Sequence, residues 1–153
     1  MEDHPLSLMM MDVNKFKQIN DQYGHQTGDN ALIWVADLLK KVAGDEGLAI
    51  RYAGDEFMML LPQMGKQASL KKAEQLYNEL HKKFFHQDSL NSPLQIPFST
   101  GIASAPQDAG NSKSLIQKAD IALYALKKEG HDCFVNAGEI SQAEVFDKAT
   151  IYQ

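Results

Sequence analysis

The sequence predicts one domain of the α/β or α+β class, built on a mixed β-sheet with helices on its faces. The chain has 153 residues, the length of about one domain. Three long segments carry apolar residues at helical spacing, and short apolar runs of strand length lie between and around them. Two of these runs are separated by a tight turn, which pairs strands antiparallel, whereas strands joined through a helix can pair in parallel.

The N-terminal part predicts a strand and two helices. The apolar run 6–11 indicates a buried strand that ends at Asp12. Residues 14–23 have the pattern of a short helix that stops at Gly24. Gly28-Asp29-Asn30 is a typical helix start. The second helix then continues as far as Gly44, with an apolar face made by Leu32, Val35, Leu39 and Val42.

A β-hairpin is predicted next. The runs 48–52 and 57–61 are apolar, and Ala53-Gly54-Asp55-Glu56 separates them. Gly54 can adopt the positive φ that many tight turns need.

The C-terminal half predicts two more helices and two strands. One helix follows Gly65, and its apolar face comprises Leu70, Ala73, Leu76, Leu80 and Phe84. The other helix follows Ser112 and ends at Gly130, and its apolar face comprises Leu115, Ala119, Ala122 and Leu126. Strands are predicted at 98–105 and 133–135, polar loops at 86–97 and 106–111, and a tail or linker at 139–153.

Composition and charge exclude several classes of protein. A hydrophobic fraction of 44% and a charged fraction of 23% are those of a folded chain. The net charge of -5 argues against a nucleic-acid binder with a broad basic surface. The single cysteine, Cys133, cannot form an internal disulfide, which favours a reducing cytoplasm. No apolar run approaches the roughly 18 residues that span a bilayer, and the acidic start is not that of a signal peptide.

Carboxylates gather where the first predicted strand and the hairpin end. Asp12 follows the strand, and Asp55 and Glu56 lie in the hairpin turn. If the two strands are neighbours, these oxygens converge at one edge of the sheet, where they suit Mg²⁺ that is also bound by substrate phosphates. Gly54 has no side chain and allows a phosphate close to the backbone. The alternative is that Gly, Asp and Glu only form a common turn.

A second polar group lies between the first two predicted helices and comprises Asn20, Gly24, His25, Gly28 and Asp29. The Asp29 carboxylate is an acceptor that matches the adjacent N1–H and N2–H₂ donors of guanine, a pair that adenine lacks. Asn20 would bind the base with it. The alternative is that Asp29 is only an N-cap.

A third group stands at the end of the last long helix, where Lys127, Lys128 and His131 follow one another closely. Cations at this end complement the helix dipole and need no ligand. The alternative is that they bind a triphosphate.

In combination, these residues closely resemble the GGDEF family of diguanylate cyclases. The resemblance rests on five blocks, which are 11–21 (MDVNKFKQIND), 23–29 (YGHQTGD), 51–57 (RYAGDEF), 99–103 (STGIA) and 118–130, the last with Lys118-Ala119-Asp120, Tyr124, Lys127 and Gly130. The blocks have the family's order and spacing and cover about residues 6–135. A lone AGDEF string would be a weak signal, whereas five ordered blocks are a strong signal for the fold.

The resemblance implies a fold similar to the palm of adenylyl cyclases and polymerases, with the signature hairpin on a central antiparallel pair of strands. Members of the family condense two GTP into cyclic di-GMP and release pyrophosphate, and each domain of a homodimer holds one GTP. For this chain the resemblance implies Mg²⁺ or Mn²⁺ held by Asp12, Asp55 and the Val13 carbonyl. It also implies that Glu56 assists the metal or activates the attacking 3′-hydroxyl.

The resemblance further implies a binding site for GTP. Asn20 and Asp29 are expected to read the guanine. The backbone amides near Lys15 and Phe16, together with the Lys127 side chain, are expected to hold the β- and γ-phosphates. Gly54 is expected to line the α-phosphate, and His131 stands where the family usually has a phosphate-binding Arg.

The sequence departs from the family pattern at several positions. Ala53 replaces the first signature glycine, which costs about 1 kcal/mol if that position needs a positive φ. His131 is a poorer phosphate clamp than Arg. Gly44 and Gly47 stand where an inhibitory Arg-x-x-Asp motif is usual, so we expect no inhibitory site of that kind. The family's leading helix and Asp-x-Leu-Thr-Gly-Leu-x-Asn-Arg segment are not found before the first strand.

Two functions follow as alternatives. One is an active diguanylate cyclase, favoured by Asp12, Asp55, Glu56, Asn20 and Asp29. The other is a catalytically degenerate GTP-binding or dimerisation module that regulates an attached domain, favoured by the departures at 53 and 131 and by the missing N-terminal segment. In both cases we expect residues 1–138 to form the cyclase-type domain of a longer cytoplasmic protein. We expect this domain to contact neither nucleic acid nor membrane.

Overall fold

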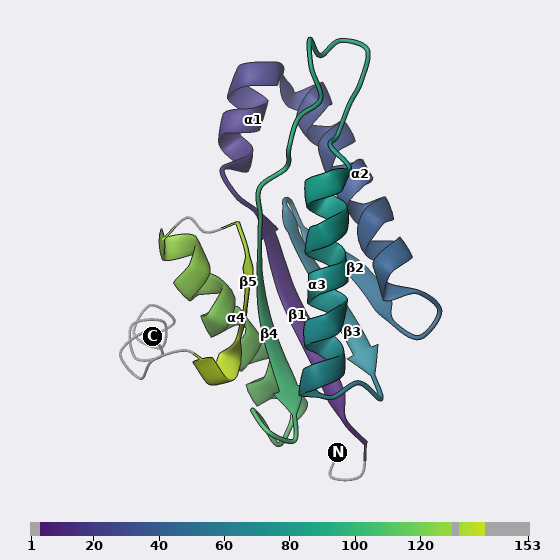
Figure 1. Ribbon diagram of the computed structural model, residues 1–153. Helices are drawn as coiled ribbons and strands as arrows, with labels where there is room; N and C mark the ends of the chain where they lie inside the picture. Colours follow the sequence, from purple (N-terminus) through teal and green to yellow (C-terminus); the bar gives the residue numbers. More distant parts are fainter. Residues whose placement is uncertain (1–3, 130–131, 140–153) are drawn as a thin grey trace.

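The structure is a computed structural model that describes residues 4–129 and 132–139. Its strands are β1 (Leu6–Val13), β2 (Leu48–Ala53), β3 (Glu56–Pro62), β4 (Phe98–Ala105) and β5 (Phe134–Asn136). Its helices are α1 (Phe16–Tyr23), α2 (His25–Ala43), α3 (Lys66–Lys82) and α4 (Ser112–Glu129), with a 3₁₀ turn η1 at Ala137–Glu139. Figure 1 shows their arrangement.

In the described part of the chain, five strands form one sheet in the order β2-β3-β1-β4-β5. The central strand β1 pairs antiparallel with both β3 and β4, and β2 pairs antiparallel with β3. β5 runs parallel to β4, and these two strands are connected through α4. The predicted mixed, mainly antiparallel sheet with helices on its faces is therefore confirmed.

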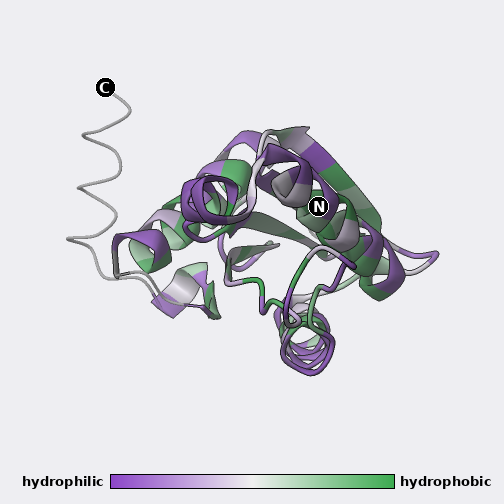
Figure 2. Cartoon of the chain, turned by 90° about the horizontal axis from the view of Figure 1, so that it is seen from above, coloured by the Kyte–Doolittle hydropathy of each residue, from purple (hydrophilic) through white to green (hydrophobic). Residues whose placement is uncertain are grey.

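The central strand is buried on both faces because helices cover both. Successive side chains of a strand point to opposite faces. Met9 and Met11 therefore pack into a core shared with α2 and α3, whereas Leu8 and Met10 pack into a second core beneath α4. This double burial explains why the segment 6–11 is almost continuously apolar. In Figure 2 the helices are largely green on the side facing the sheet and purple on the outer side.

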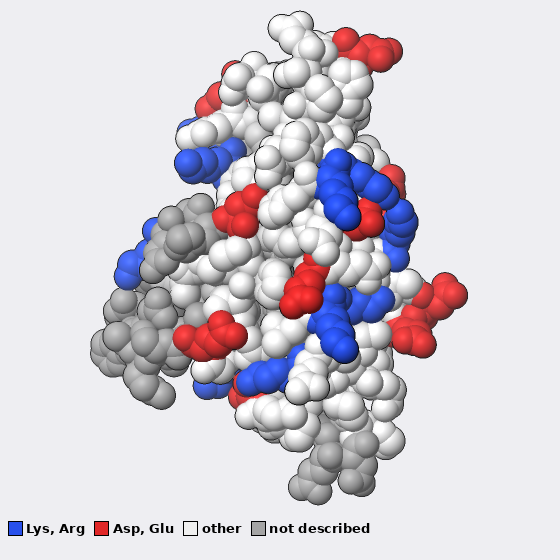
Figure 3. Space-filling model, in the orientation of Figure 1, with Lys and Arg blue, Asp and Glu red and all other residues white. Residues whose placement is uncertain are grey.

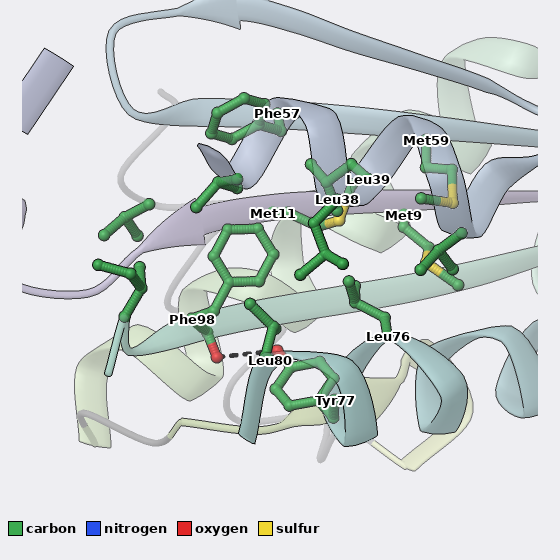
Figure 4. Packing of buried hydrophobic residues seen from close by; sticks show 14 of the residues in the cluster. Met9, Met11, Leu38, Leu39, Phe57, Met59, Leu76, Tyr77, Leu80 and Phe98 are labelled. Carbon is green, nitrogen blue, oxygen red and sulfur yellow. Dashed lines mark hydrogen bonds between the residues drawn. The ribbon is translucent and has the colours of Figure 1, made fainter. Parts of the chain in front are cut away.

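The larger core lies between the sheet and the helices α2 and α3 (Figure 4). Within it, the Tyr77 hydroxyl of α3 lies 2.8 Å from the Phe98 carbonyl oxygen and 2.7 Å from the Cys133 carbonyl oxygen. Burial raises the pKa of this hydroxyl well above its usual value, so it stays protonated and can donate. One side chain thus attaches α3 to β4 and to the start of β5.

The predicted start of the second helix is wrong. α2 begins at His25, because Gly24 adopts φ 93° and reverses the chain directly after α1. Gly28 lies inside the helix, where its amide donates to the Gly24 carbonyl at 3.1 Å. Asp29 follows within the helix, so the alternative in which it acts as the N-cap is wrong. The first strand also extends beyond its predicted end, because Asp12 pairs with Glu56 and Ser99 on either side.

The predicted polar loop after α3 is partly apolar. Phe85 and Leu94 form a two-way backbone bridge, with N–O distances of 2.9 and 2.7 Å. Leu90 and Ile96 of the same loop are buried in the larger core. Phe84, predicted on the apolar face of the helix, instead follows its end and is 43% exposed. Gly130 and residues 140–153, most of the predicted tail, lie outside the described residues.

Charges of both signs are interspersed on the face drawn in Figure 3. The net charge of the chain is -5. Among the helices of residues 4–129, none is long and apolar enough to cross a membrane.

Gly101 of β4 lies directly beneath α4 and provides a test of this packing. A Cβ at this position would overlap the Ala119 carbonyl oxygen and the Leu123 amide nitrogen, and these backbone atoms yield only if α4 moves. We expect Gly101→Ala to lower the free energy of unfolding by about 1–3 kcal/mol, measured by urea titration.

Gly110→Ala is the matched control, because a Cβ there would meet no described atom within 4 Å. This variant should be neutral or stabilised by up to about 1 kcal/mol. Equal stabilities of the two variants would contradict the close contact of α4 with β4.

Candidate functional site

The ends of β1 and of the β2–β3 hairpin meet at one edge of the sheet. Asp12 of β1 stands in register with Glu56 of β3. The Val13 amide donates to the Asp55 carbonyl oxygen at 3.2 Å, which fastens the hairpin turn to the end of β1. Since β1 and β3 are neighbours, the structure brings together the carboxylates that the sequence placed on separate segments.

Asp12 is a buried carboxylate with incomplete compensation. Its side chain is 2% exposed, and one oxygen, Oδ2, forms an ion pair with Lys127 Nζ from the last turn of α4. The other oxygen, Oδ1, is buried and has no hydrogen-bond partner among the described residues. Burial raises the pKa of Asp12 to about 7, with a further increase from the Asp55 carboxyl, although Lys127 opposes the shift. Lys127 therefore does not fully compensate the negative charge of an ionised Asp12, and the site has room for a further cation.

This donor set fits a metal ion that arrives with phosphates. Within residues 4–129 and 132–139, no three His, Cys, Asp or Glu side chains are grouped so that they alone could hold a metal. Asp12 and Asp55 lie close enough for their carboxyls to interact, and the Asp12 Oδ1 atom is unpaired. One or two carboxylates completed by substrate phosphate oxygens and water form the ligand set that Mg²⁺ prefers.

A cavity of about 320 Å³ opens beside these carboxylates and reaches along α4. Its lining includes Asp12, Glu56, Asp120, Tyr124, Lys127 and Lys128. The volume lies at the lower end of the range for small-molecule sites. The sequence motifs gave Asp120 and Tyr124 no role in the site. Asp120, Tyr124 and Lys127 follow one another at spacings of four and three residues, which puts all three on one face of a helix and was the available signal.

The hairpin turn has a backbone that tolerates the variant signature. Gly54 has φ 37°, and its carbonyl accepts a hydrogen bond from Arg51 Nε at 2.7 Å. Ala53 is not among the described residues with positive φ. Position 53 does not need a positive φ in this structure, so the alanine there carries no backbone strain of that kind. Beside the turn, burial and the nearby Glu56 carboxylate raise the pKa of Tyr52 to about 12.

The predicted base-reading residues lie apart from the cavity, on the α1–α2 hairpin. Asn20 of α1 faces α2 at Gly28, where a Cβ would collide with Asn20 Oδ1. Gly28 is thus needed for space rather than for a turn. Asn20 Oδ1 is buried and has no hydrogen-bond partner among the described residues. Asp29, the next residue along α2, is exposed.

The predicted phosphate-binding residues lie between these two regions and at the end of α4. Lys15 adopts a left-handed backbone conformation, with φ 54° and ψ 38°, and its side chain is exposed. Phe16 begins α1 and packs against the larger core. The first amides of a helix have no acceptor within it and attract anions. Lys127 and Lys128 stand in the last turn of α4, whereas His131 lies outside the described residues.

The whole arrangement matches a known family. Residues 1–133 match the family described as "Diguanylate cyclase, GGDEF domain". The chain belongs to the GGDEF family. The resemblance found in the sequence is therefore confirmed, and the central sheet corresponds to the fold of that family.

The chain is similar to members of the GGDEF family both in sequence and in structure. Diguanylate cyclase A of Treponema denticola is 34% identical over 127 residues, covering 83% of this chain and 34% of that protein. The GGDEF domain of DgcB from Caulobacter crescentus, solved in complex with c-di-GMP, has a TM-score of 0.81 at 32% identity and covers 90% of this chain and 81% of that one. The active GGEEF domain of a Vibrio cholerae diguanylate cyclase has a TM-score of 0.76 at 28% identity, with coverages of 87% and 83%.

The chain spans about a third of the length of the Treponema relative. The family and the fold are thus shown by these matches, whereas the activity of this chain requires an argument from its own residues.

The raised pKa of Asp12 predicts a specific pH dependence of stability. In metal-free protein, folded Asp12 keeps its proton up to a pKa of about 7, whereas the unfolded carboxyl loses it near 3.8. Between these values the folded state binds more protons, so the free energy of unfolding falls as pH rises. Asp12→Asn cannot ionise and should remove this slope in urea titrations across the range. Parallel stability profiles for the two proteins would contradict the raised pKa of Asp12 in the folded state.

Proposed function

We propose that this domain is a diguanylate cyclase, which condenses two GTP into cyclic di-GMP and pyrophosphate. The observation that carries the proposal is the meeting of Asp12, the Asp55-Glu56 turn and Lys127 at one sheet edge beside a cavity. Carboxylates for a metal and cations for phosphates are the groups that phosphoryl transfer requires. The GGDEF family membership gives this chemistry its substrate.

In this proposal Asp12, Asp55 and the Val13 carbonyl hold Mg²⁺ or Mn²⁺. Such an ion lowers the pKa of a hydroxyl and neutralises a departing pyrophosphate. Glu56 lines the same cavity and either assists the metal or accepts the proton of the attacking 3′-hydroxyl. The protein then contributes mainly position and charge, since phosphoryl transfer asks for little covalent chemistry from side chains.

The substrate is held along the path from the sheet edge to α2. Lys127 and His131 bind the terminal phosphates, with the backbone amides near Lys15 and Phe16, and Gly54 lines the α-phosphate. Asn20 and Asp29 read the guanine. The unpaired Asn20 Oδ1 supports this role, because a buried amide oxygen calls for a donor such as a base can provide.

Two domains are needed, since each binds one GTP and the product joins two. We therefore propose a catalytic homodimer, with the domain attached to other domains of a longer protein. GTP is supplied in the cytoplasm, where we place the domain. Gly44 and Gly47 carry no charged side chain, and the absence of the usual Arg-x-x-Asp inhibition stays a prediction.

The alternative, a degenerate GTP-binding module, loses one of its supports. Ala53 does not need a positive φ in this structure. The departure at His131 still favours the alternative.

Loss of either metal-binding carboxylate should abolish turnover. We expect Asp12→Ala and Asp55→Ala to reduce formation of cyclic di-GMP from GTP and Mg²⁺ at least about a hundredfold, because the developing phosphate charge loses its metal. Chromatographic separation of the nucleotides gives the rates. Asp37→Ala, which removes an exposed carboxylate of α2, should keep wild-type activity.

Full activity in either site variant would remove the metal assignment. Wild-type protein that binds GTP and forms no product would instead establish the regulatory module.

Asp29 should determine the choice of base. Its carboxylate pairs with two guanine donors and would be left unpaired against adenine. We expect Asp29→Ala to lower the preference for a non-hydrolysable GTP analogue over its ATP counterpart by about tenfold or more, measured as dissociation constants. Asp37→Ala on the same helix is again the control. An unchanged preference in Asp29→Ala would show that other groups read the base.

A further inference from the structure

The side chain of Gln87 hydrogen-bonds the loop between α3 and β4 to the first turns of α2. Gln87 donates from Nε2 to Thr27 Oγ1 at 2.6 Å and accepts at Oε1 from Asn30 Nδ2 at 2.9 Å. A third contact, from Nε2 to Ser89 Oγ at 2.6 Å, ties Gln87 to its own loop. Thr27 is buried, and Gln87 and Asn30 are partly buried.

Apolar side chains of this loop pack into the core and fix the position of its backbone. Phe85 is 4% exposed, and its ring meets Trp34 of α2 edge-on at a centroid distance of 6.2 Å. Leu90 is buried, and its amide donates to the Gln87 carbonyl at 3.0 Å. The Gln87 backbone is thus held by the core, and its side chain is not a mobile surface group.

The contacts fall on one stripe of α2. Thr27, Asn30 and Trp34 are three and four residues apart, the spacing of neighbours on one helix face. Gly28 and Asp29 lie between Thr27 and Asn30 in the chain, so they belong to the same turn but to other faces of it. Gly28 faces Asn20, and Asp29 is exposed. The loop therefore holds this turn from one side while its other sides carry the proposed guanine-binding groups.

We propose that Gln87 is a positioning residue for guanine selectivity, which fixes the first turns of α2 so that Asp29 and Asn20 meet the base edge together. The proposal rests on the proposed function, in which these two residues read guanine. Discrimination by paired hydrogen bonds demands closely fixed donors and acceptors, and small displacements weaken it. Loss of Gln87 should therefore affect GTP more than ATP, which makes no paired contact with Asp29.

The test uses two substitutions of Gln87, one that removes its hydrogen bonds and one that keeps hydrogen-bond acceptors and adds a negative charge. Gln87→Leu has similar bulk and makes no polar contact. Gln87→Glu keeps both contacts, since its oxygens accept from Asn30 Nδ2 and from the Thr27 hydroxyl, which can donate. Dissociation constants are measured for the α,β-methylene analogues of GTP and ATP, on protein that is folded by circular dichroism.

We expect Gln87→Leu to lower the GTP-to-ATP analogue preference about tenfold, mainly through weaker binding of the GTP analogue. Gln87→Glu should retain the preference within about twofold. Ser89→Ala, which breaks the contact inside the loop and leaves both bonds to α2, should also retain it within about twofold. If Gln87→Leu does not fold, Thr27→Val on α2 removes the hydrogen bond between Thr27 and Gln87. This variant should show a smaller loss of the GTP-to-ATP analogue preference.

Failure of this inference can be told apart from failure of the proposed function. A preference that is kept in Gln87→Leu and lost in Asp29→Ala overturns the role of Gln87 and leaves guanine reading by Asp29 intact. Equal weakening of both analogues in Gln87→Leu also overturns it, because a merely structural contact has no base preference. A preference kept in Asp29→Ala refutes the proposed reading of guanine, and the role of Gln87 falls with it.

Discussion

The ion pair between Asp12 and Lys127 joins the two halves of the site across 115 residues of sequence. Asp12 ends the central strand, which is covered on both faces, and Lys127 ends the helix on one of those faces. The pair can form only because α4 lies close to the sheet. Gly101 and Ala119 make that approach possible, since neither presents a side chain larger than a methyl group at the contact. Close packing by small residues thus determines the electrostatics of the cavity.

Burial of Asp12 lowers the free energy of unfolding of the domain and favours the binding of a cation beside this carboxylate. A carboxylate in this position has its pKa raised to about 7 and keeps one oxygen without a partner. A single lysine ammonium, exposed on its outer side, compensates this charge only in part. A metal ion would supply the missing positive charge beside Asp12, and the phosphate oxygens bound to it would supply negative charges that pair with Lys127. Perturbed ionisable groups concentrate at functional sites for this reason.

The sequence predicted the sheet and most helices because hydrophobic period and hairpin chemistry are local. The sequence-based prediction was wrong where the type of a residue is explained by a contact with another segment rather than by its own secondary structure. Gly28-Asp29-Asn30 has the composition of a helix start, yet Gly28 is there to make room for Asn20. The loop after α3 is polar in composition, but Phe85, Leu90 and Ile96 enter the core. The carboxylates were found because residue type and motif spacing carry them. The contact of Gln87 with Thr27, 60 residues away, leaves no trace in either segment alone.

The two ends of the proposed site rest on different supports, and in this proposal the phosphate end sets the rate and the guanine end sets the selectivity. Asp12 is buried on the central strand β1, which has a neighbour on each side, and Asp55 and Glu56 are partly buried at the hairpin turn and the start of β3. Asn20 and Asp29 stand on a helical hairpin beyond the sheet edge, held by the contact between α1 and α2 and by the loop that carries Gln87. Under the proposed function, changes in that loop are expected to alter which base is bound while the phosphate end keeps its geometry.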